Sequence, residues 1–290
     1  MNYRHQFHAG NFADVFKHTV LVRLVRALQR KPVGLLLLDT HAGRGTYDLA
    51  AAAQGDSRAR TPEWPEGLGR LSGRDDLPAA VAEYLELVRA FDRRRGNADP
   101  TPRHYPGSPW LLHAVARPQD RLAACELQPD EFAALRAEFA YERRTTVQLL
   151  DGYTALRAML PPPEKRALVL IDPPFESQDE FALIANGLKE GLRRLPGGTF
   201  AVWFPLTERA GVAEFDREGG LRHTVALPPT LVVHLMVNAE TSKLKGCGLL
   251  IVNPPWQFDQ ELAPLADWLA DALAQAPGGG MELRWLVPET

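Results

Sequence analysis

Hydrophobic residues along the 290-residue chain follow two spacings in turn, one typical of buried strands and one typical of amphipathic helices. Short apolar runs predict strands at 34–39, 121–127, 146–150, 166–171 and 199–204. Apolar residues at helical spacing predict helices at 12–30, 129–140, 152–159 and 178–194, with a further helix from Ser108. Strands that alternate with helices pair in parallel through right-handed crossovers. The pattern therefore predicts an α/β fold around a doubly wound, mostly parallel sheet.

The pattern changes in the last third of the chain. Segments rich in β-formers, joined by short connections, lie at 221–227, 231–237 and 247–252. Segments joined this closely pair antiparallel. We expect them to form an antiparallel edge on the same sheet, followed by a helix at 257–275 and a last strand at 281–287.

Residues 53–104 interrupt the alternation. They are rich in Gly, Pro and Arg around one helical stretch, AAVAEYLELVRAFDRRR. We predict that 53–104 form an inserted helical subdomain and that 1–52 and 105–290 form the main domain. A helix is expected to begin near Thr46, before the insertion.

The composition allows a sizeable core, because 45% of the residues are hydrophobic. A net charge of −3 argues against a generally basic nucleic-acid-binding protein, but it allows a local basic face. Residues 1–31 contain one acidic residue, Asp14, against six basic ones and three histidines: Arg4, Lys17, Arg23, Arg26, Arg30, Lys31, His5, His8 and His18. A charge run is most often a solvated helix face. The alternative is a phosphate-contacting surface that includes Arg4, His8 and Lys17.

The two cysteines and the distribution of apolar segments indicate where the protein is located in the cell. Cys125 and Cys247 lie in strand-like apolar stretches, and we expect buried free thiols in a reducing compartment. The N-terminus has no apolar core typical of a secretory leader, and no run of eighteen apolar residues occurs. A cytoplasmic protein without membrane contact is expected. No paired-histidine motif suggests a metal site, so none is predicted.

A glycine loop of sequence DTHAGRG follows the first predicted strand, from Asp39 to Gly45. Glycine is needed where the backbone turns tightly and passes close to a ligand, as Gly43 and Gly45 would. The dinucleotide fingerprint requires a third small residue, but Asp48 occupies that position. The loop therefore favours a nucleoside without phosphates, such as S-adenosylmethionine, over a nicotinamide cofactor of an oxidoreductase.

Acidic residues end the next two predicted strands. Glu126 is placed to accept the ribose hydroxyls of the cofactor, and Asp151, followed by Gly152, is placed to accept its adenine amino group. Each alone is more often an ordinary strand-end acid. Because ligands bind at the carboxyl ends of parallel strands, acids at successive strand ends indicate one cofactor site.

The fourth strand of the series runs into Asp172-Pro173-Pro174-Phe175. A proline-rich turn is the simpler interpretation. The functional one is that the Asp172 carboxylate and the Pro173 carbonyl accept hydrogen bonds from the N6 amine of an adenine. These bonds would direct the nitrogen lone pair at the methyl donor. Phe175 would then stack against the extruded base.

A second sequence of the same kind, Asn253-Pro254-Pro255-Trp256, also follows a predicted strand. Chain order favours Asp172. Its strand is fourth in the series and is expected beside the first strand at the switch point, whereas Asn253 is expected at a remote edge. A cytosine-type mechanism is disfavoured because neither cysteine is placed as a nucleophile.

Several of these motifs occur together in a known family. The segments YRHQFHAGNFADVFKH, LDTHAGRGTYDL, YPGSP, IDPPF and IVNPPW, in this order, resemble bacterial J-type large-subunit ribosomal RNA adenine-N6 methyltransferases. The likeness extends from Tyr3 to Pro288, and the N-terminal block is its most specific part.

The resemblance implies a Rossmann-like class I methyltransferase that uses S-adenosylmethionine and acts as a monomer on protein-free or precursor 23S RNA. It implies cofactor contacts at His18, His41, Ser108, Glu126, Asp151 and Gly152, with Asp172 as the catalytic acid. Tyr3 would close over the target site. The usual aromatic after the prolines is Tyr in this family and Phe175 here, so stacking is kept but a phenol hydrogen bond is lost.

Two other functions share part of this pattern. An adenine-N6 DNA methyltransferase would use the same chemistry, but it normally needs a larger recognition region than 53–104 and no helix-turn-helix signature appears. A non-catalytic RNA-binding protein with a degenerate cofactor fold is opposed by the complete Asp172-Pro173-Pro174-Phe175 sequence.

Overall fold

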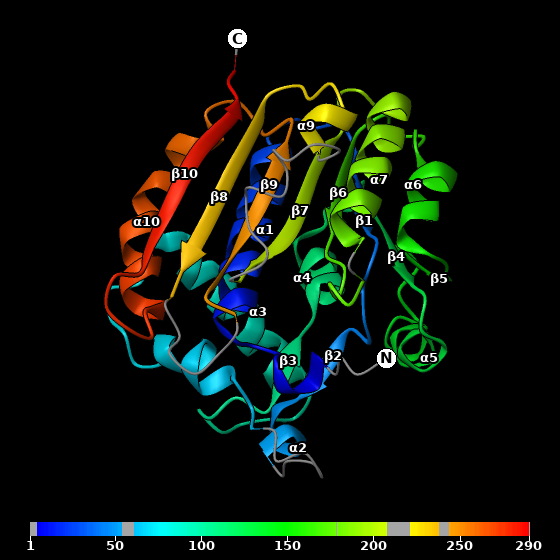
Figure 1. Cartoon of the computed structure of the whole chain (residues 1–290). Helices are drawn as coiled ribbons and strands as arrows, with labels where there is room; N and C mark the ends of the chain where they lie inside the picture. The colour runs from blue at the N-terminus through cyan, green and yellow to red at the C-terminus, as the bar shows by residue number, and fades with distance from the viewer. Residues whose placement is uncertain (1–4, 54–60, 178, 208–220, 238–243, 290) are drawn as a thin grey trace.

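The fold is described from a computed structural model that covers residues 5–53, 61–177, 179–207, 221–237 and 244–289. Its centre is one eight-stranded sheet (Figure 1). The strands are β1 (Leu36–Asp39), β4 (Arg121–Glu126), β5 (Thr145–Leu149), β6 (Ala167–Ile171), β7 (Thr199–Leu206), β8 (Thr230–Met236), β9 (Gly246–Val252) and β10 (Gly280–Val287). Their order across the sheet is β10-β8-β9-β7-β6-β1-β4-β5.

Pairing within the sheet divides it into two parts. Strands β5, β4, β1, β6 and β7 are parallel, whereas β9, β8 and β10 join β7 in antiparallel pairs. This confirms the predicted mostly parallel α/β sheet with an antiparallel edge. β1 lies between β4 and β6, so the chain order reverses at β1, and this switch point is where α/β sheets bind ligands.

Helices cover both faces of the sheet. One face packs against α1 (Phe12–Leu28), α3 (Ala79–Arg94), α4 (Ser108–Val115), α5 (Pro129–Glu138) and α10 (Phe258–Leu273). The other packs against α6 (Gly152–Met159), α7 (Glu180–Arg194) and α9 (Leu221–Thr224). Successive strand residues point to opposite faces, so Leu37 joins the first core whereas Leu36 and Leu38 join the second. No helix among the described residues is long and apolar enough to cross a membrane.

The inserted segment is rooted in a small second sheet. β2 (Thr46–Asp48) pairs antiparallel with β3 (His104–Pro106). The predicted start of a helix near Thr46 is therefore wrong. Thr46–Asp48 form a strand because they pair with β3, and the helix α2 (Leu49–Ala53) begins only after them. Between the two strands lie η2 (Trp64–Glu66), η3 (Leu68–Leu71) and α3. The division of the chain into a main domain and a subdomain at 53–104 stays a prediction. The buried side chains of α3 belong to the same hydrophobic core as those of α1.

The predicted strand at 221–227 is also wrong. Leu221–Thr224 form the short helix α9, with Leu221 and Val225 buried against the second core. An apolar residue every fourth position fits a helical turn as well as a short strand. The predicted free thiols are confirmed, since Cys125 and Cys247 are both buried and unbridged.

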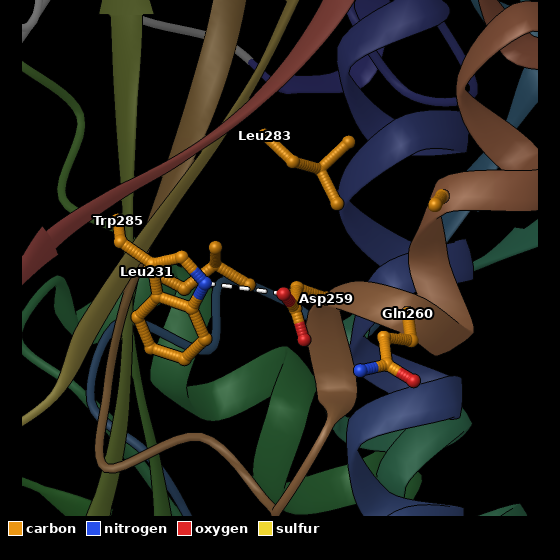
Figure 2. A pocket seen from close by; sticks show the side chains of 6 residues that line it. Leu231, Asp259, Gln260, Leu283 and Trp285 are labelled. Atoms are coloured by element: carbon orange, nitrogen blue, oxygen red, sulfur yellow. Dashed lines mark hydrogen bonds between the residues drawn. The ribbon is translucent and has the colours of Figure 1, made fainter. Parts of the chain in front are cut away.

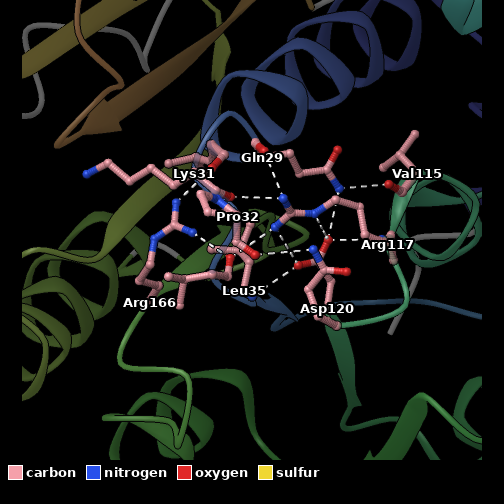
Figure 3. A network of polar contacts seen from close by, with 12 residues as sticks. Gln29, Lys31, Pro32, Leu35, Val115, Arg117, Asp120 and Arg166 are labelled. Atoms are coloured by element: carbon pink, nitrogen blue, oxygen red, sulfur yellow. Dashed lines mark hydrogen bonds and ion pairs between the residues drawn. The ribbon is translucent and has the colours of Figure 1, made fainter.

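A polar network centred on the buried Asp120 fixes the turn between α1 and β1 (Figure 3). The fully buried side chain of Asp120 accepts hydrogen bonds from the Leu35 backbone N–H, at 3.1 Å, and from the Gln29 amide, at 3.0 Å, and it forms an ion pair with Arg117 at 3.0 Å. Arg117 and Arg166 also donate to the last carbonyls of α1 and the turn, those of Leu28, Gln29, Lys31 and Val33. Cations at a helix C-terminus are favourable, so this network holds α1 in place on the sheet.

The antiparallel edge is covered by α10 (Figure 2). The Trp285 indole on β10 donates a hydrogen bond to Asp259 on α10 at 3.1 Å. A small pocket between these elements is lined by Leu231, Asp259, Gln260, Ala263, Leu283 and Trp285. This edge lies away from the switch point between β1 and β6.

Candidate active site

The glycine loop after β1 is tied to both neighbouring strands. The Thr40 N–H donates to the Leu170 carbonyl of β6 at 3.1 Å, and the Ala42 N–H donates to the Cys125 carbonyl of β4 at 2.9 Å. These bonds fix the loop at the carboxyl ends of three adjacent strands. Residues that follow β4 and β6 are therefore brought beside it.

Gly43 adopts the left-handed backbone conformation that its position in the loop requires. Its φ is 58°, and a side chain there would lie 2.6 Å from the Tyr47 hydroxyl. The Gly43 N–H donates to Oε2 of Glu126 at 2.9 Å, while the Gln128 N–H donates to Oε1 at 2.7 Å. A carboxylate offers about four acceptor sites, so Glu126 keeps capacity for ribose hydroxyls. Burial raises its pKa, against the effect of these backbone donors.

The start of α6 lies directly against the same loop. Asp151 is its N-cap, and one carboxylate oxygen accepts the Thr154 N–H at 2.7 Å. A side chain at Gly152 would come within 2.4 Å of the Thr40 carbonyl and within 2.8 Å of the His41 ring. Glycine alone allows α6 to approach this closely, so the acid reaches the loop.

We expect Gly152→Ala to impair cofactor binding and folding together. The added methyl meets backbone on one side, so α6 must move away from the loop, and overpacking of this kind costs about 1–3 kcal/mol. Calorimetric titration with S-adenosylmethionine and denaturant unfolding measure the two effects. Gly197→Ala is a matched control, since nothing lies within 4 Å of a side chain there. Normal binding by Gly152→Ala would contradict the close approach.

His41 is a neutral side chain in this site. Burial lowers its pKa to about 4, although Asp172 and Asp151 act in the opposite direction. Its Nδ1 lies 2.8 Å from the Thr40 hydroxyl, and its ring contacts the edge of Tyr153 with centroids 5.4 Å apart. The ring thus lies between the glycine loop and α6, where the sequence predicts the cofactor.

Asp39, the last residue of β1, is fully buried. Ser108, the first residue of α4, donates its hydroxyl to Asp39 at 2.7 Å. Burial raises the pKa of Asp39 to about 7, the Ser108 bond lowers it, and the nearby Asp172 carboxylate raises it further. Ser108 therefore lies beside the glycine loop through its bond to Asp39, and its contact with the cofactor stays a prediction.

Asp39 should make stability depend on pH. Its pKa rises from 3.8 in a model peptide to about 7 in the folded protein, so the folded state holds an extra proton between these values. Its contribution to stability is present at low pH and is lost as pH rises through 7. We expect Asp39→Asn to gain about 2–3 kcal/mol relative to the wild type between pH 5 and pH 8, at about 1.4 kcal/mol per pKa unit. Urea unfolding of both proteins at the two pH values measures this, and a constant difference would contradict it.

Asp172 lies at the end of β6, beside β1, as predicted from chain order. Its Oδ2 forms an ion pair with Nζ of Lys17 at 2.6 Å, and Lys17 also pairs with Asp14 at 2.9 Å. Asp14 in turn accepts the Gly10 N–H at 3.0 Å. Burial lowers the pKa of Lys17, but the two carboxylates outweigh it and raise the pKa well above its ordinary value. A fixed cation thus orients the Asp172 carboxylate.

The turn after Asp172 is rigid. Pro173 is buried, and Phe175 has a φ of 50°, which is uncommon for a bulky residue and concentrated at functional sites. The Phe175 ring packs against Phe181 and Trp203, with centroids 5.3 and 5.7 Å away. Its partly buried ring is held beside Asp172 by these neighbours.

His18 lies on α1, directly after Lys17. Its ring is 1% exposed, and Nδ1 lies 2.7 Å from the hydroxyl of Tyr105 on β3. The Tyr105 hydroxyl lies 2.9 Å from that of Tyr84 on α3. A polar chain therefore connects the inserted segment to α1.

Asn253 belongs to a different part of the sheet. It follows β9, which runs antiparallel to β7. It therefore lies beside the start of β7, at the other end of the strands from Asp172. Its amide donates to the carbonyls of Pro196 and Gly198 at 2.8 and 2.9 Å, and its own carbonyl accepts from Thr199. Asn253 closes the turn before β7. The expectation that Asn253 lies at a remote edge of the sheet is wrong, because β9 is an interior strand between β8 and β7.

The basic N-terminal face differs from the expectation. Lys17 is wrong as a phosphate contact, because it is 5% exposed and paired with two acids. The arginines of α1 and of the turn after it are paired as well: Arg23 and Arg30 with Glu261, and Arg26 with Glu83. His8 is partly exposed, with Nδ1 2.9 Å from Glu63. Tyr3 and Arg4 lie outside the described residues.

Comparison with known proteins places these motifs in a family. The family described as RsmJ, "Ribosomal RNA large subunit methyltransferase D, RlmJ", matches residues 32–287. Two curated relatives, both called ribosomal RNA large subunit methyltransferase J, are similar over the full length of both chains. The Escherichia coli (strain K12) protein is 36% identical and the Haemophilus influenzae protein 33% identical. The chain belongs to the RlmJ family.

One solved structure is similar over nearly the whole chain. Protein LPL1258 of Legionella pneumophila is 34% identical, with a TM-score of 0.82 over 96% of this chain and 97% of that one. Membership of the RlmJ family confirms the resemblance seen in the sequence and the predicted enzyme class, a ribosomal RNA methyltransferase. Together with the strand order, it confirms a Rossmann-like methyltransferase fold.

Sequence reasoning missed the residues that connect the site. Asp14 was visible as the single acid of a basic stretch, three residues before Lys17, and this spacing allows a pair on one helix face. Tyr105 begins the YPGSP motif, but nothing in the sequence indicated its contact with Tyr84 or His18, since these contacts join segments far apart in the chain. Among the described residues, no group of His, Cys, Asp or Glu side chains is arranged to hold a metal ion.

Proposed function

We propose that this protein transfers the methyl group of S-adenosylmethionine to the N6 amine of one adenine in 23S ribosomal RNA. The proposal rests on one observation above all. The Asp172 carboxylate, fixed by Lys17, lies at the end of β6 directly beside the glycine loop of β1. An amine bound by this turn would therefore lie next to a cofactor bound by the loop.

The residues of the loop fit S-adenosylmethionine. Glu126 can accept the ribose hydroxyls, Asp151 the adenine amino group, and Gly43 and Gly152 leave room for close approach. His18, His41 and Ser108 complete the proposed cofactor site. When bound, the cofactor supplies a methyl group activated by a sulfonium.

The chain's own residues prepare the amine for attack. Lys17 occupies Oδ2 of Asp172, which leaves Oδ1 to accept one amine N–H, while the Pro173 carbonyl accepts the other. Both acceptors favour a nitrogen whose lone pair points toward the methyl group. Phe175 offers a ring face for the extruded base. Catalysis then comes from alignment and preorganised acceptors. The methylated nitrogen loses its extra proton after the transfer, so no strong base is required.

The substrate assignment draws on the relatives, which are both called large-subunit ribosomal RNA methyltransferases. We propose protein-free or precursor 23S RNA, methylated by a monomer in the cytoplasm. Tyr3 is proposed to close over the target, with Arg4 and His8 contacting RNA nearby. Pairing of Arg23, Arg26 and Arg30 with acids leaves less basic surface there than the sequence suggests.

Transfer of tritium from labelled cofactor tests the function. Protein-free 23S RNA, assembled large subunits and duplex DNA are incubated separately with enzyme and cofactor. We expect label on free RNA and little on assembled subunits or DNA. Equal labelling of duplex DNA would favour the DNA methyltransferase alternative, and no transfer to any substrate, with RNA binding kept, would favour a degenerate binding protein.

A further inference from the structure

The two histidines of the proposed cofactor site contact hydroxyl groups that restrict where each ring carries its proton. We propose that Tyr105, oriented by Tyr84, holds His18 with its hydrogen on Nε2, while Thr40 holds His41 with its hydrogen on Nδ1. The inference rests on the proposed function, because it concerns how these rings meet S-adenosylmethionine. Tyr105 and Thr40 are then positioning residues for the cofactor.

The His18 assignment follows from counting hydroxyl protons in a buried chain. Tyr84 and Tyr105 are both fully buried, at 0% exposure, and their hydroxyls lie 2.9 Å apart. Tyr105 also lies 2.7 Å from His18 Nδ1. If Tyr84 donates to Tyr105 and Tyr105 donates to Nδ1, both contacts are hydrogen bonds and both protons are used.

The opposite arrangement wastes a donor. If His18 Nδ1 carried the proton, Tyr105 would accept it, and one of the two tyrosine hydroxyl protons would have no acceptor among the described residues. A buried O–H without an acceptor costs free energy. The Nε2 atom of His18 lies 4.0 Å from Oδ1 of Asp14, whose negative charge attracts a hydrogen on Nε2 and would repel a lone pair there. The chain therefore favours an unprotonated Nδ1, so a neutral His18 carries its hydrogen on Nε2.

The His41 assignment uses a single hydroxyl proton. The Thr40 hydroxyl lies 2.9 Å from the Leu170 carbonyl, which can only accept, and 2.8 Å from His41 Nδ1. Both contacts are attractive only when Thr40 donates to the carbonyl and His41 Nδ1–H donates to Thr40. Otherwise two oxygen lone pairs face each other at 2.9 Å. His41 Nε2 is then an acceptor, close to Gly152.

The two tautomers give the proposed site one hydrogen-bond donor and one acceptor. His18 presents an N–H, which suits the carboxylate of the methionine portion, the only anionic group of S-adenosylmethionine. His41 presents a lone pair, which suits an N–H of the cofactor. The inserted segment contributes to this polarity, because Tyr84 lies on α3 and Tyr105 on β3.

Nitrogen-15 NMR of histidine-labelled enzyme reads the tautomers directly. The two signals are assigned with His18→Gln and His41→Gln variants, and spectra are recorded without ligand. We expect the hydrogen on Nε2 of His18 and on Nδ1 of His41 in the wild type. The double variant Tyr84→Phe/Tyr105→Phe removes both hydroxyls, which avoids a stranded donor and preserves packing. It should change the His18 pattern and leave that of His41 unaltered.

Cofactor affinity provides the second readout. The double variant should weaken binding of S-adenosylmethionine about tenfold, as expected for one hydrogen bond to a charged group. In a His18→Gln background, whose amide donates without help from Tyr105, the same double change should have no further effect. Tyr141→Phe is the matched control, since Tyr141 is 96% exposed.

Two results would overturn the inference. One is a wild-type His18 with its hydrogen on Nδ1, and the other is a double variant with unchanged tautomer and affinity. A wild-type enzyme that binds no S-adenosylmethionine would instead refute the proposed function. The ligand-free spectra separate the two failures.

Discussion

Asp172→Asn is expected to lower kcat for 23S RNA methylation by about 100- to 1,000-fold, the typical cost of one preorganised polar partner. The amide keeps the shape of the side chain but loses its charge. Because Lys17 donates to the one remaining oxygen, the NH₂ group faces the amine and cannot accept its N–H. Lys17 also loses one of its two anionic partners. The dissociation constant for S-adenosylmethionine should change little, because the proposed cofactor contacts lie on the loop, Glu126 and α6. Single-turnover methylation and calorimetric titration measure the two quantities.

Asp130→Asn is a matched control for this change. Asp130 is exposed in the first turn of α5, and the same substitution there should leave methylation unchanged. Wild-type turnover by Asp172→Asn would remove the basis for the proposed chemistry. A loss of cofactor binding instead of turnover would place Asp172 in the cofactor site.

Removal of Lys17 is expected to produce the largest loss of stability. Its ammonium lies between Asp14 and Asp172 at 2.9 and 2.6 Å and is nearly inaccessible to solvent. Lys17→Met would leave two carboxylates without their cation, and breaking a buried ion pair costs about 3–5 kcal/mol. Methylation should also fall, since Asp172 loses the group that orients it. Denaturant unfolding and single-turnover rates measure both effects.

A second substitution separates charge from packing. In Lys17→Met/Asp14→Asn one of the stranded carboxylates is neutralised, so part of the lost stability should return while methylation stays low. Arg30→Met serves as the control, because Arg30 is largely exposed in its pair with Glu261 and such pairs contribute about 0–1 kcal/mol. An equally small loss for Lys17→Met would mean that the carboxylates are solvated.

Local pattern was sufficient for most of the sheet. Helix α6 begins and ends where its apolar spacing predicts, and β6 lies beside β1 as chain order requires. Prediction failed where a distant partner decided the conformation. Thr46–Asp48 became a strand because His104–Pro106 pairs with it, and this pairing closes a long segment that periodicity does not connect.

The site was predictable in its strand-end residues but not in its electrostatics. Glu126, Asp151 and Asp172 were recognisable because strand ends of a parallel sheet meet at one edge. Lys17 was misjudged as a surface cation, since its partner Asp172 is 155 residues away and only the docking of α1 on the sheet brings them together. The same docking buries His18 against Tyr105.

Identification of the methylated nucleoside tests the central claim most directly. Free 23S RNA is methylated by the wild-type enzyme, digested to nucleosides and analysed by mass spectrometry against standards. If the N6 amine of adenine is hydrogen-bonded to Asp172 and Pro173, the product must be N6-methyladenosine. A methyl group on N1 or C2 of adenine, on another base, or on a ribose hydroxyl would contradict the account.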